Sequence, residues 1–212
     1  MCFKMGPTAF LLSLLAFLPT SFSFAASENW GTPYDVFFER NDLKAEYSRS
    51  KNGEEKRSVT IPNQTRINQT KKDGKVSTRT SDISGNGAVL CAREIYLAVK
   101  TVLDNCDDFD YPNAQKELLV ALEKIDKFVS ENSIIPVSQE ELKTDSKRRN
   151  TEFKDRFSGN QPHICNGKVG EKERKFIEYI AQRIEGMSED EFKSEIEKLL
   201  SVPRLPVTNP CL

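Results

Sequence analysis

The sequence predicts an α+β fold, in which a small N-terminal antiparallel β-meander precedes a disulfide-stapled bundle of about five α-helices. Three observations support this prediction. Turn-forming residue pairs recur at intervals of ten or eleven residues between positions 41 and 74, a spacing typical of hairpins. Apolar residues recur every three or four residues from about position 91, as in amphipathic helices. Four cysteines follow a leader-like N-terminus, which favours disulfides.

Residues 1–25 are interpreted as a signal peptide. Lys4 supplies a positive start, an apolar stretch runs from Phe10 to Leu18, and Ser23-Phe24-Ala25 fits a cleavage site. The apolar stretch is too short to span a bilayer. We therefore expect an exported chain, periplasmic or extracellular, without stable membrane insertion. Removal of Lys4 leaves 30 of the 31 Lys and Arg residues against 32 Asp and Glu, a net charge of −2.

Residues 26–83 are predicted to form a basic β-meander, with a partly disordered segment as the alternative. Four turn pairs would separate five strands, at 34–40, 43–51, 54–61, 64–72 and 75–82: Asn41-Asp42, Asn52-Gly53, Pro62-Asn63 and Asp73-Gly74. The Asn-Gly and Asp-Gly pairs also predict type I′ turns, because both turn positions then have a positive φ. Apolar alternation fades in the last two strands, whose polar composition also fits disorder.

The sheet region is strongly basic. From Lys44 to Arg79 there are ten basic and four acidic residues. Aromatic residues for base stacking are absent after Tyr47, so we expect no nucleic-acid binding and favour a solvated, aggregation-resistant surface. Asn63-Gln-Thr65 and Asn68-Gln-Thr70 fit the N-glycosylation pattern, which matters only in a eukaryotic secretory pathway.

Residues 84–212 are predicted to form the helical, disulfide-stapled domain, which ends in an extended Pro-rich tail. Helices are expected at about 91–106, 113–131, 138–157, 171–185 and 188–200. Ser-x-x-Glu capping boxes open two of them, at Ser138 and Ser188. In the first helix, Arg93 falls off the apolar stripe and is expected to face water. Three prolines favour the extended tail: Pro203, Pro206 and Pro210.

Four cysteines are the predicted structural disulfides: Cys91, Cys106, Cys165 and Cys211. Cys91 and Cys106 share one helical stripe about 22 Å apart, whereas a disulfide needs Cα atoms within about 7 Å. Each should therefore pair with Cys165 or Cys211, and both pairings stay open. We favour Cys91–Cys165 with Cys106–Cys211, because two final helices that run out and back would leave Cys165 and Cys211 near one end of the bundle.

The sequence indicates no catalytic, cofactor-binding or metal-binding residues. His163 near Cys165 could serve thiol chemistry or a zinc site, but both need free thiols, and we favour a structural disulfide with a bystander histidine. The best candidates for a polar contact with a partner are basic residues of the predicted helix at 138–157, although a solvated helix surface is the favoured explanation: Lys147, Arg148, Arg149 and Arg156.

The sequence therefore predicts an exported, non-enzymatic binding or structural protein without a cofactor, whose partner is another protein. A hydrolase whose carboxylates meet only in the fold is the first alternative. The second alternative comes from a resemblance. In its cysteine order and its Pro210-Cys211 pair, the segment from Asn86 to Leu212 resembles periplasmic immunity proteins against amidase toxins. This resemblance implies an inhibitor-type protein that binds an enzyme.

Overall fold

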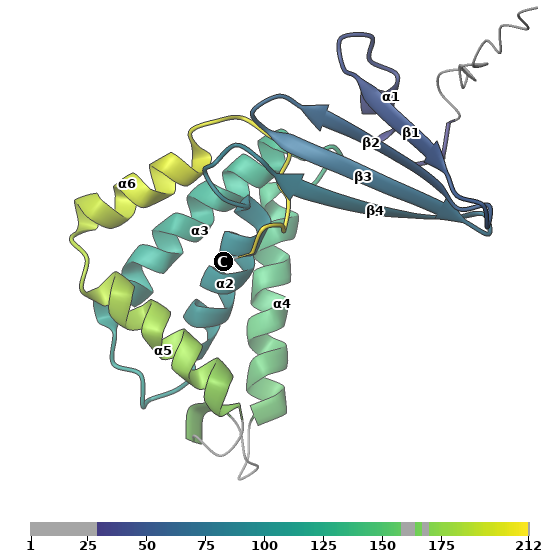
Figure 1. Cartoon of the computed structure of the whole chain (residues 1–212). Helices are drawn as coiled ribbons and strands as arrows, with labels where there is room; N and C mark the ends of the chain where they lie inside the picture. The colour runs from purple at the N-terminus through teal and green to yellow at the C-terminus, as the bar shows by residue number, and fades with distance from the viewer. Residues whose placement is uncertain (1–28, 158–163, 167–169, 212) are drawn as a thin grey trace, which may run out of the picture.

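The chain forms an antiparallel sheet that projects from one end of a helical bundle (Figure 1). This computed structural model describes residues 29–157, 164–166 and 170–211; the predicted signal peptide lies outside them. The strands are β1 (Ala45–Arg49), β2 (Glu55–Ile61), β3 (Thr65–Lys72) and β4 (Lys75–Asp82), and they pair in chain order. A meander followed by disulfide-linked helices is the predicted fold class, which is thereby confirmed.

The sheet has one covered face and one open face, because successive side chains of a strand point to opposite sides. Val59, Ile61 and Ile67 lie on the covered face and form a small core with Phe38. The register places Val59 opposite Ile67, and a shift by one residue would turn this core toward solvent. The polar strands β3 and β4 are thus held by pairing and register.

The two predicted type I′ turns differ. Asp73 and Gly74 both have a positive φ, 51° and 74°, and they connect the paired residues Lys72 and Lys75, as a type I′ turn requires. In the β1–β2 turn only Gly53 has a positive φ, 79°, and its N–H donates to the carbonyl of Ser50 over 3.1 Å. The prediction is wrong there, because the loop has three residues and ends in a left-handed glycine.

Replacing Gly74 by alanine should lower the free energy of unfolding by about 1–2 kcal/mol, the cost of a left-handed conformation for an L-residue. No heavy atom lies within 4 Å of the place where the new Cβ would stand, so the cost is conformational rather than steric. Gly186→Ala is the matched control, because Gly186 has an ordinary φ of −82°. Urea unfolding of the two variants measures the difference, and equal losses would contradict the prediction.

The prediction of a strand at residues 34–40 is wrong, because this segment contains the short helix α1 (Asp35–Phe38). Asp35 forms a buried ion pair with Arg57 of β2. The Arg57 guanidinium also contacts the rings of Trp30 and Phe38, 4.3 and 4.1 Å from their centroids. These contacts, which join residues 19 to 27 positions apart, close the N-terminal segment over the sheet and override the local alternation.

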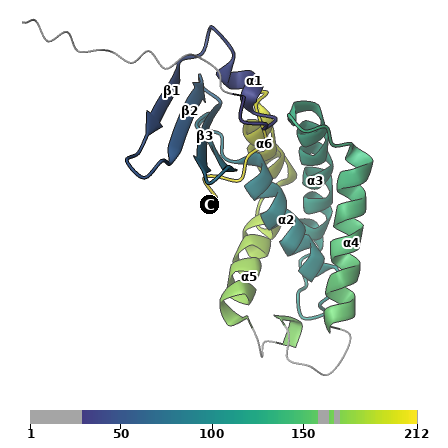
Figure 2. The ribbon, with the colours of Figure 1, turned by 90° about the vertical axis from the view of Figure 1, so that its right-hand side faces the viewer.

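Within the described residues the bundle has the five predicted α-helices: α2 (Val89–Leu103), α3 (Pro112–Asn132), α4 (Gln139–Phe157), α5 (Glu171–Glu185) and α6 (Glu189–Leu200). A short 3₁₀ helix, η1 (Ile164–Asn166), precedes α5. Figure 2 shows α2 and α3 between α4 on one side and α5 on the other. Both capping boxes are present, at Ser138–Glu141 and Ser188–Glu191. None of the described helices is long and apolar enough to cross a membrane.

The tail after α6 joins the sheet to the bundle. Leu205 packs against the sheet core, and Val207 is buried beside Ala88 and Cys91 of the helical part. Between them, the buried side chain of Arg204 forms an ion pair with Asp82, the last residue of β4. Its other N–H groups donate to three carbonyl oxygens, those of Gly87 (2.7 Å), Leu199 (2.8 Å) and Val202 (2.9 Å).

Candidate functional site

The disulfides are Cys91–Cys211 and Cys106–Cys165, with Cα atoms 5.3 and 5.1 Å apart. Our favoured pairing is therefore wrong. The reason is that α5 and α6 do not run out and back: in Figure 1 α5 rises from the η1 end of the bundle, and α6 continues from there toward the sheet. Cys165 stays beside Cys106 at the far end, and the tail brings Cys211 to Cys91 near the sheet. Two disulfides indicate an oxidising environment.

Because Cys165 is bonded to Cys106, it is neither a thiolate nor a metal ligand in this structure. His163 lies outside the described residues. Within residues 29–157, 164–166 and 170–211, no group of three or more His, Cys, Asp or Glu side chains is arranged to hold a metal ion.

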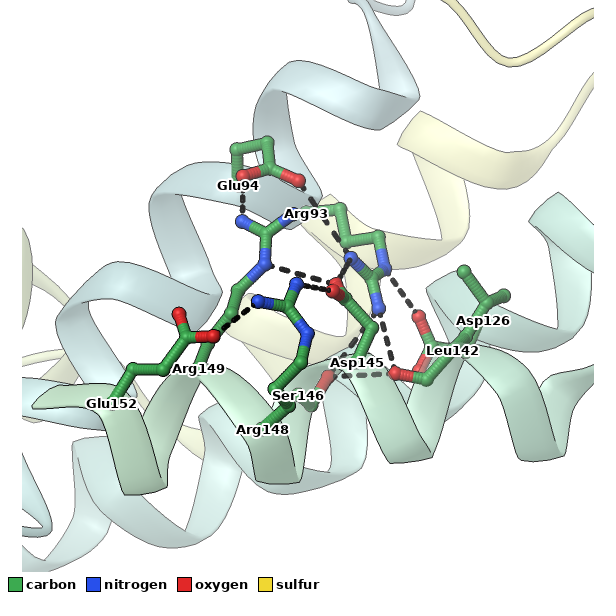
Figure 3. A network of polar contacts seen from close by, with 9 residues as sticks. All are labelled: Arg93, Glu94, Asp126, Leu142, Asp145, Ser146, Arg148, Arg149 and Glu152. Carbon is green, nitrogen blue, oxygen red and sulfur yellow. Dashed lines mark hydrogen bonds and ion pairs between the residues drawn. The ribbon is translucent and has the colours of Figure 1, made fainter.

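Two of the predicted contact residues, Arg148 and Arg149, belong to a network of ion pairs between α4 and α2 (Figure 3). Arg148 pairs with Glu152 over 2.6 Å and also with Asp145. Arg149 pairs with Asp145 over 2.9 Å and with Glu94 of α2. Burial raises the pKa of Asp145, but the hydrogen bonds from the two arginines outweigh it, so this pKa lies below its ordinary value.

Arg93 is the buried centre of this network, only 3% exposed, so the prediction that it faces water is wrong. Its Nε lies 2.6 Å from Asp126 of α3, and its terminal nitrogen donates to the carbonyl of Leu142 over 3.1 Å. It is buried because α4 packs over this side of α2. The guanidinium thereby links three helices, and removal of its charge would leave Asp126 buried without a counter-ion.

The network leaves little of the predicted α4 contact surface for a partner. Three guanidinium groups meet four carboxylates in it, so the charge of Arg148 and Arg149 is neutralised within the chain. Lys147 and Arg156 are exposed and form no ion pair with any residue in the described ranges. Of the four predicted contact residues on α4, these two are therefore the ones whose charge is not paired with a described residue.

The open face of the sheet concentrates the free positive charge instead. We define this face by the residues that alternate with the buried ones, grouped by strand: Glu46, Ser48; Lys56, Ser58, Thr60; Arg66, Asn68, Thr70, Lys72; Lys75, Ser77, Arg79, Ser81. It has five basic side chains and one acidic one. Lys56 pairs with Glu54 over 2.8 Å. The other four cations pair with no described residue: Arg66, Lys72, Lys75 and Arg79.

The open face also carries a local electrostatic cost. Lys72 and Lys75 stand directly opposite each other across the β3–β4 hairpin, and like charges in such a pair destabilise a sheet. Arg79, in the same row of side chains, stands opposite the neutral Asn68. An anion placed over this row would relieve the repulsion. The turn pair Asp73-Gly74 implies the Lys72–Lys75 pairing, so sequence alone could have located this cluster.

A cleft of about 520 Å³ lies between the β2–β3 turn, the start of the tail and the end of α3, and Arg40, Asp42, Glu131 and Arg204 are among its lining residues. The Arg204 guanidinium is directed to Asp82 and backbone carbonyls. A hydrogen bond from Arg40 holds the pKa of Asp42 below its ordinary value, whereas a general acid needs a raised pKa. The cleft therefore lends no support to the hydrolase alternative.

Comparisons with known proteins do not add a relative. No family model matches the chain, and neither does any curated protein or solved structure. The resemblance to immunity proteins stays a prediction.

Proposed function

We propose that the chain is an exported binding protein, which holds an acidic surface of another protein against the open face of its sheet. The observation that carries this proposal is the set of four cations without an internal partner on one face: Arg66, Lys72, Lys75 and Arg79. Because none of them forms an ion pair with a described residue, all four are available to a partner from outside the described part of the chain. The two disulfides support an extracytoplasmic place of action.

The covered face of the sheet holds, for comparison, a cation whose partners belong to the chain itself. Arg57 there is buried with Asp35, Gln69 and two aromatic rings. On the open face the side chains between the cations are serine, threonine and asparagine, which can hydrogen-bond to a partner. A polar, charged patch of this kind favours a reversible complex whose association is steered by charge.

An acidic protein fits this face better than a nucleic acid does. Base recognition on a sheet uses aromatic side chains on which bases stack, and the open face has none. Carboxylates need only the cations and hydroxyl groups that are present. A nucleic acid would bind through phosphate contacts alone, and the experiment below includes that outcome.

Poly-L-glutamate should bind the wild-type protein at low salt, and affinity should fall as salt screens the charges. The variant Arg66→Glu with Arg79→Glu should bind at least about tenfold more weakly, a loss of about 1.4 kcal/mol. Fluorescence anisotropy of labelled poly-L-glutamate over a salt series measures both effects.

The matched control is Lys147→Glu with Arg156→Glu, which makes the same change in net charge on α4. Equal weakening by the two double variants would reduce the effect to net charge and contradict the proposal. A single-stranded oligonucleotide that bound more tightly than poly-L-glutamate would replace the acidic protein by a nucleic acid. Circular dichroism checks that both variants keep their fold.

A further inference from the structure

β4 is an edge strand whose peptide groups alternate between β3 and the free edge. The two-residue turn makes Lys72 and Lys75 a hydrogen-bonded pair, so Lys75, Ser77, Arg79 and Ser81 direct their N–H and C=O groups to β3. The groups of Val76, Thr78, Thr80 and Asp82 therefore point outward. Two hydrogen bonds agree with this pattern: the N–H of Ile83 donates inward to Gln64, and that of Asp82 donates outward to Asn209.

The tail already uses one end of this edge. The N–H of Asp82 donates to the carbonyl of Asn209 over 2.6 Å, and the Asn209 side chain donates to the carbonyl of Thr80 over 3.5 Å. The tail does not continue as a fifth strand, because Pro210 lacks an N–H and Cys211 is bonded to Cys91. One residue of the chain thus pairs with the edge and then turns away.

The rest of the edge is open. The N–H and C=O groups of Val76 and Thr78 bond to no other backbone group in the described part of the chain. In Figure 1 the turn end of β4 extends beyond the bundle, so none of the described helices lies along this part of the edge. An added strand here would bring its alternate side chains beside Lys75 and Arg79 on the open face, and the others beside Val76 and Thr78.

We propose that the outer part of β4, from Lys75 to Arg79, takes up an extended segment of the partner with acidic residues at every second position, which adds a fifth strand to the sheet. Main-chain hydrogen bonds supply affinity in this mode of recognition, and alternate side chains supply specificity. The inference rests on the proposed function, because it specifies how the acidic partner would engage the open face.

Charge distinguishes this occupant from a second copy of the chain. Pairing of β4 with β4 of another copy would place lysines and arginines near one another, which is how natural edge strands avoid self-association. The same cations attract a strand that carries carboxylates at matching positions. The positive charges of β4 therefore disfavour pairing with β4 of a second copy and favour pairing with an acidic segment.

A blocked peptide of four Glu-Val repeats tests the inference in the full chain. We expect it to bind, and to slow the hydrogen exchange of the Val76 and Thr78 amides. Val76→Pro should weaken this binding at least about tenfold, because it removes an outward N–H. It removes no bond to β3, so the sheet should form. Val76→Ala, which loses side-chain atoms but keeps the N–H, should bind as the wild type does.

The outcomes separate the two proposals. If Val76→Pro binds the repeat peptide as tightly as Val76→Ala, strand addition is refuted. The same holds if a peptide with four glutamates followed by four valines binds equally well. In either case the acidic-partner proposal survives if poly-L-glutamate still distinguishes the Arg66→Glu and Arg79→Glu variant from its α4 control. If neither the peptides nor poly-L-glutamate bind the wild type, both proposals fail.

Discussion

Replacing Arg204 by alanine should lower the free energy of unfolding by about 3–5 kcal/mol, the range for a broken buried ion pair. The Arg204 side chain is inaccessible to solvent, and that of Asp82 is 2% exposed. The substitution leaves the Asp82 carboxylate buried without its counter-ion. It also removes the donors for the carbonyl oxygens of Gly87, Leu199 and Val202. Urea unfolding followed by circular dichroism measures the loss.

Arg183→Ala is the control for this prediction. Arg183 pairs with Glu195 on the surface, where its side chain is 46% exposed, and such pairs contribute about 0–1 kcal/mol. Arg204→Met combined with Asp82→Asn should lose less than Arg204→Ala, because no buried charge is then left alone. The prediction is contradicted if Arg204→Ala costs no more than Arg183→Ala.

Removal of the Cys91–Cys211 disulfide, by Cys91→Ala with Cys211→Ala, should lower the free energy of unfolding by about 2–5 kcal/mol. This disulfide closes a loop of 120 residues, against 59 for Cys106–Cys165. In the loop-entropy account the longer loop stabilises more, so Cys106→Ala with Cys165→Ala should cost slightly less. Urea unfolding of the two double variants gives the comparison.

Peptide mapping without reduction checks the pairing on which this prediction depends. The expected products are one peptide pair with Cys91 and Cys211 and another with Cys106 and Cys165. A peptide pair with Cys91 and Cys165 would contradict the structure and support Cys91–Cys165 with Cys106–Cys211.

The elements that sequence could predict are those with local causes. The Asp73-Gly74 turn follows from residues that accept a positive φ, and the starts of α4 and α6 follow from Ser and Glu three residues apart. The exclusion of a Cys91–Cys106 disulfide needed only the helical rise. In each case the residues that decide the structure are neighbours in the chain.

The elements that sequence could not predict depend on distant residues. The segment 34–40 alternates like a strand, but Asp35 pairs with Arg57, which lies 22 positions away. The sequence pattern places Arg93 on the surface, but in the structure it is buried and donates a hydrogen bond to Asp126, which lies 33 positions later in the chain. The disulfide pairing depended on the direction of α6 relative to α5, and no local pattern specifies how two consecutive helices pack.

The candidate site, too, depends on residues that are distant in the chain. The basic content of residues 44–79 was visible in the sequence, and it suggested a solvated surface. Four of its cations lie on one face and form no ion pair with a described residue, while Arg57 is buried on the other face. That distinction depends on register. The α4 arginines differ from the cations of the open face. In the sequence they look available to a partner, but in the structure Arg148 and Arg149 form ion pairs with three carboxylates of the chain: Asp145, Glu94 and Glu152.

The position of the tail has a consequence for synthesis. Domains and subdomains can fold while a chain is still emerging, and the sheet and helices α2–α6 precede residue 201. The contacts of Arg204, Val207 and Cys211 are made by segments translated later. A nascent chain that contains only the sheet and the bundle therefore lacks the contacts that join them, and the Cys91–Cys211 disulfide can form only after residue 211 has been translated.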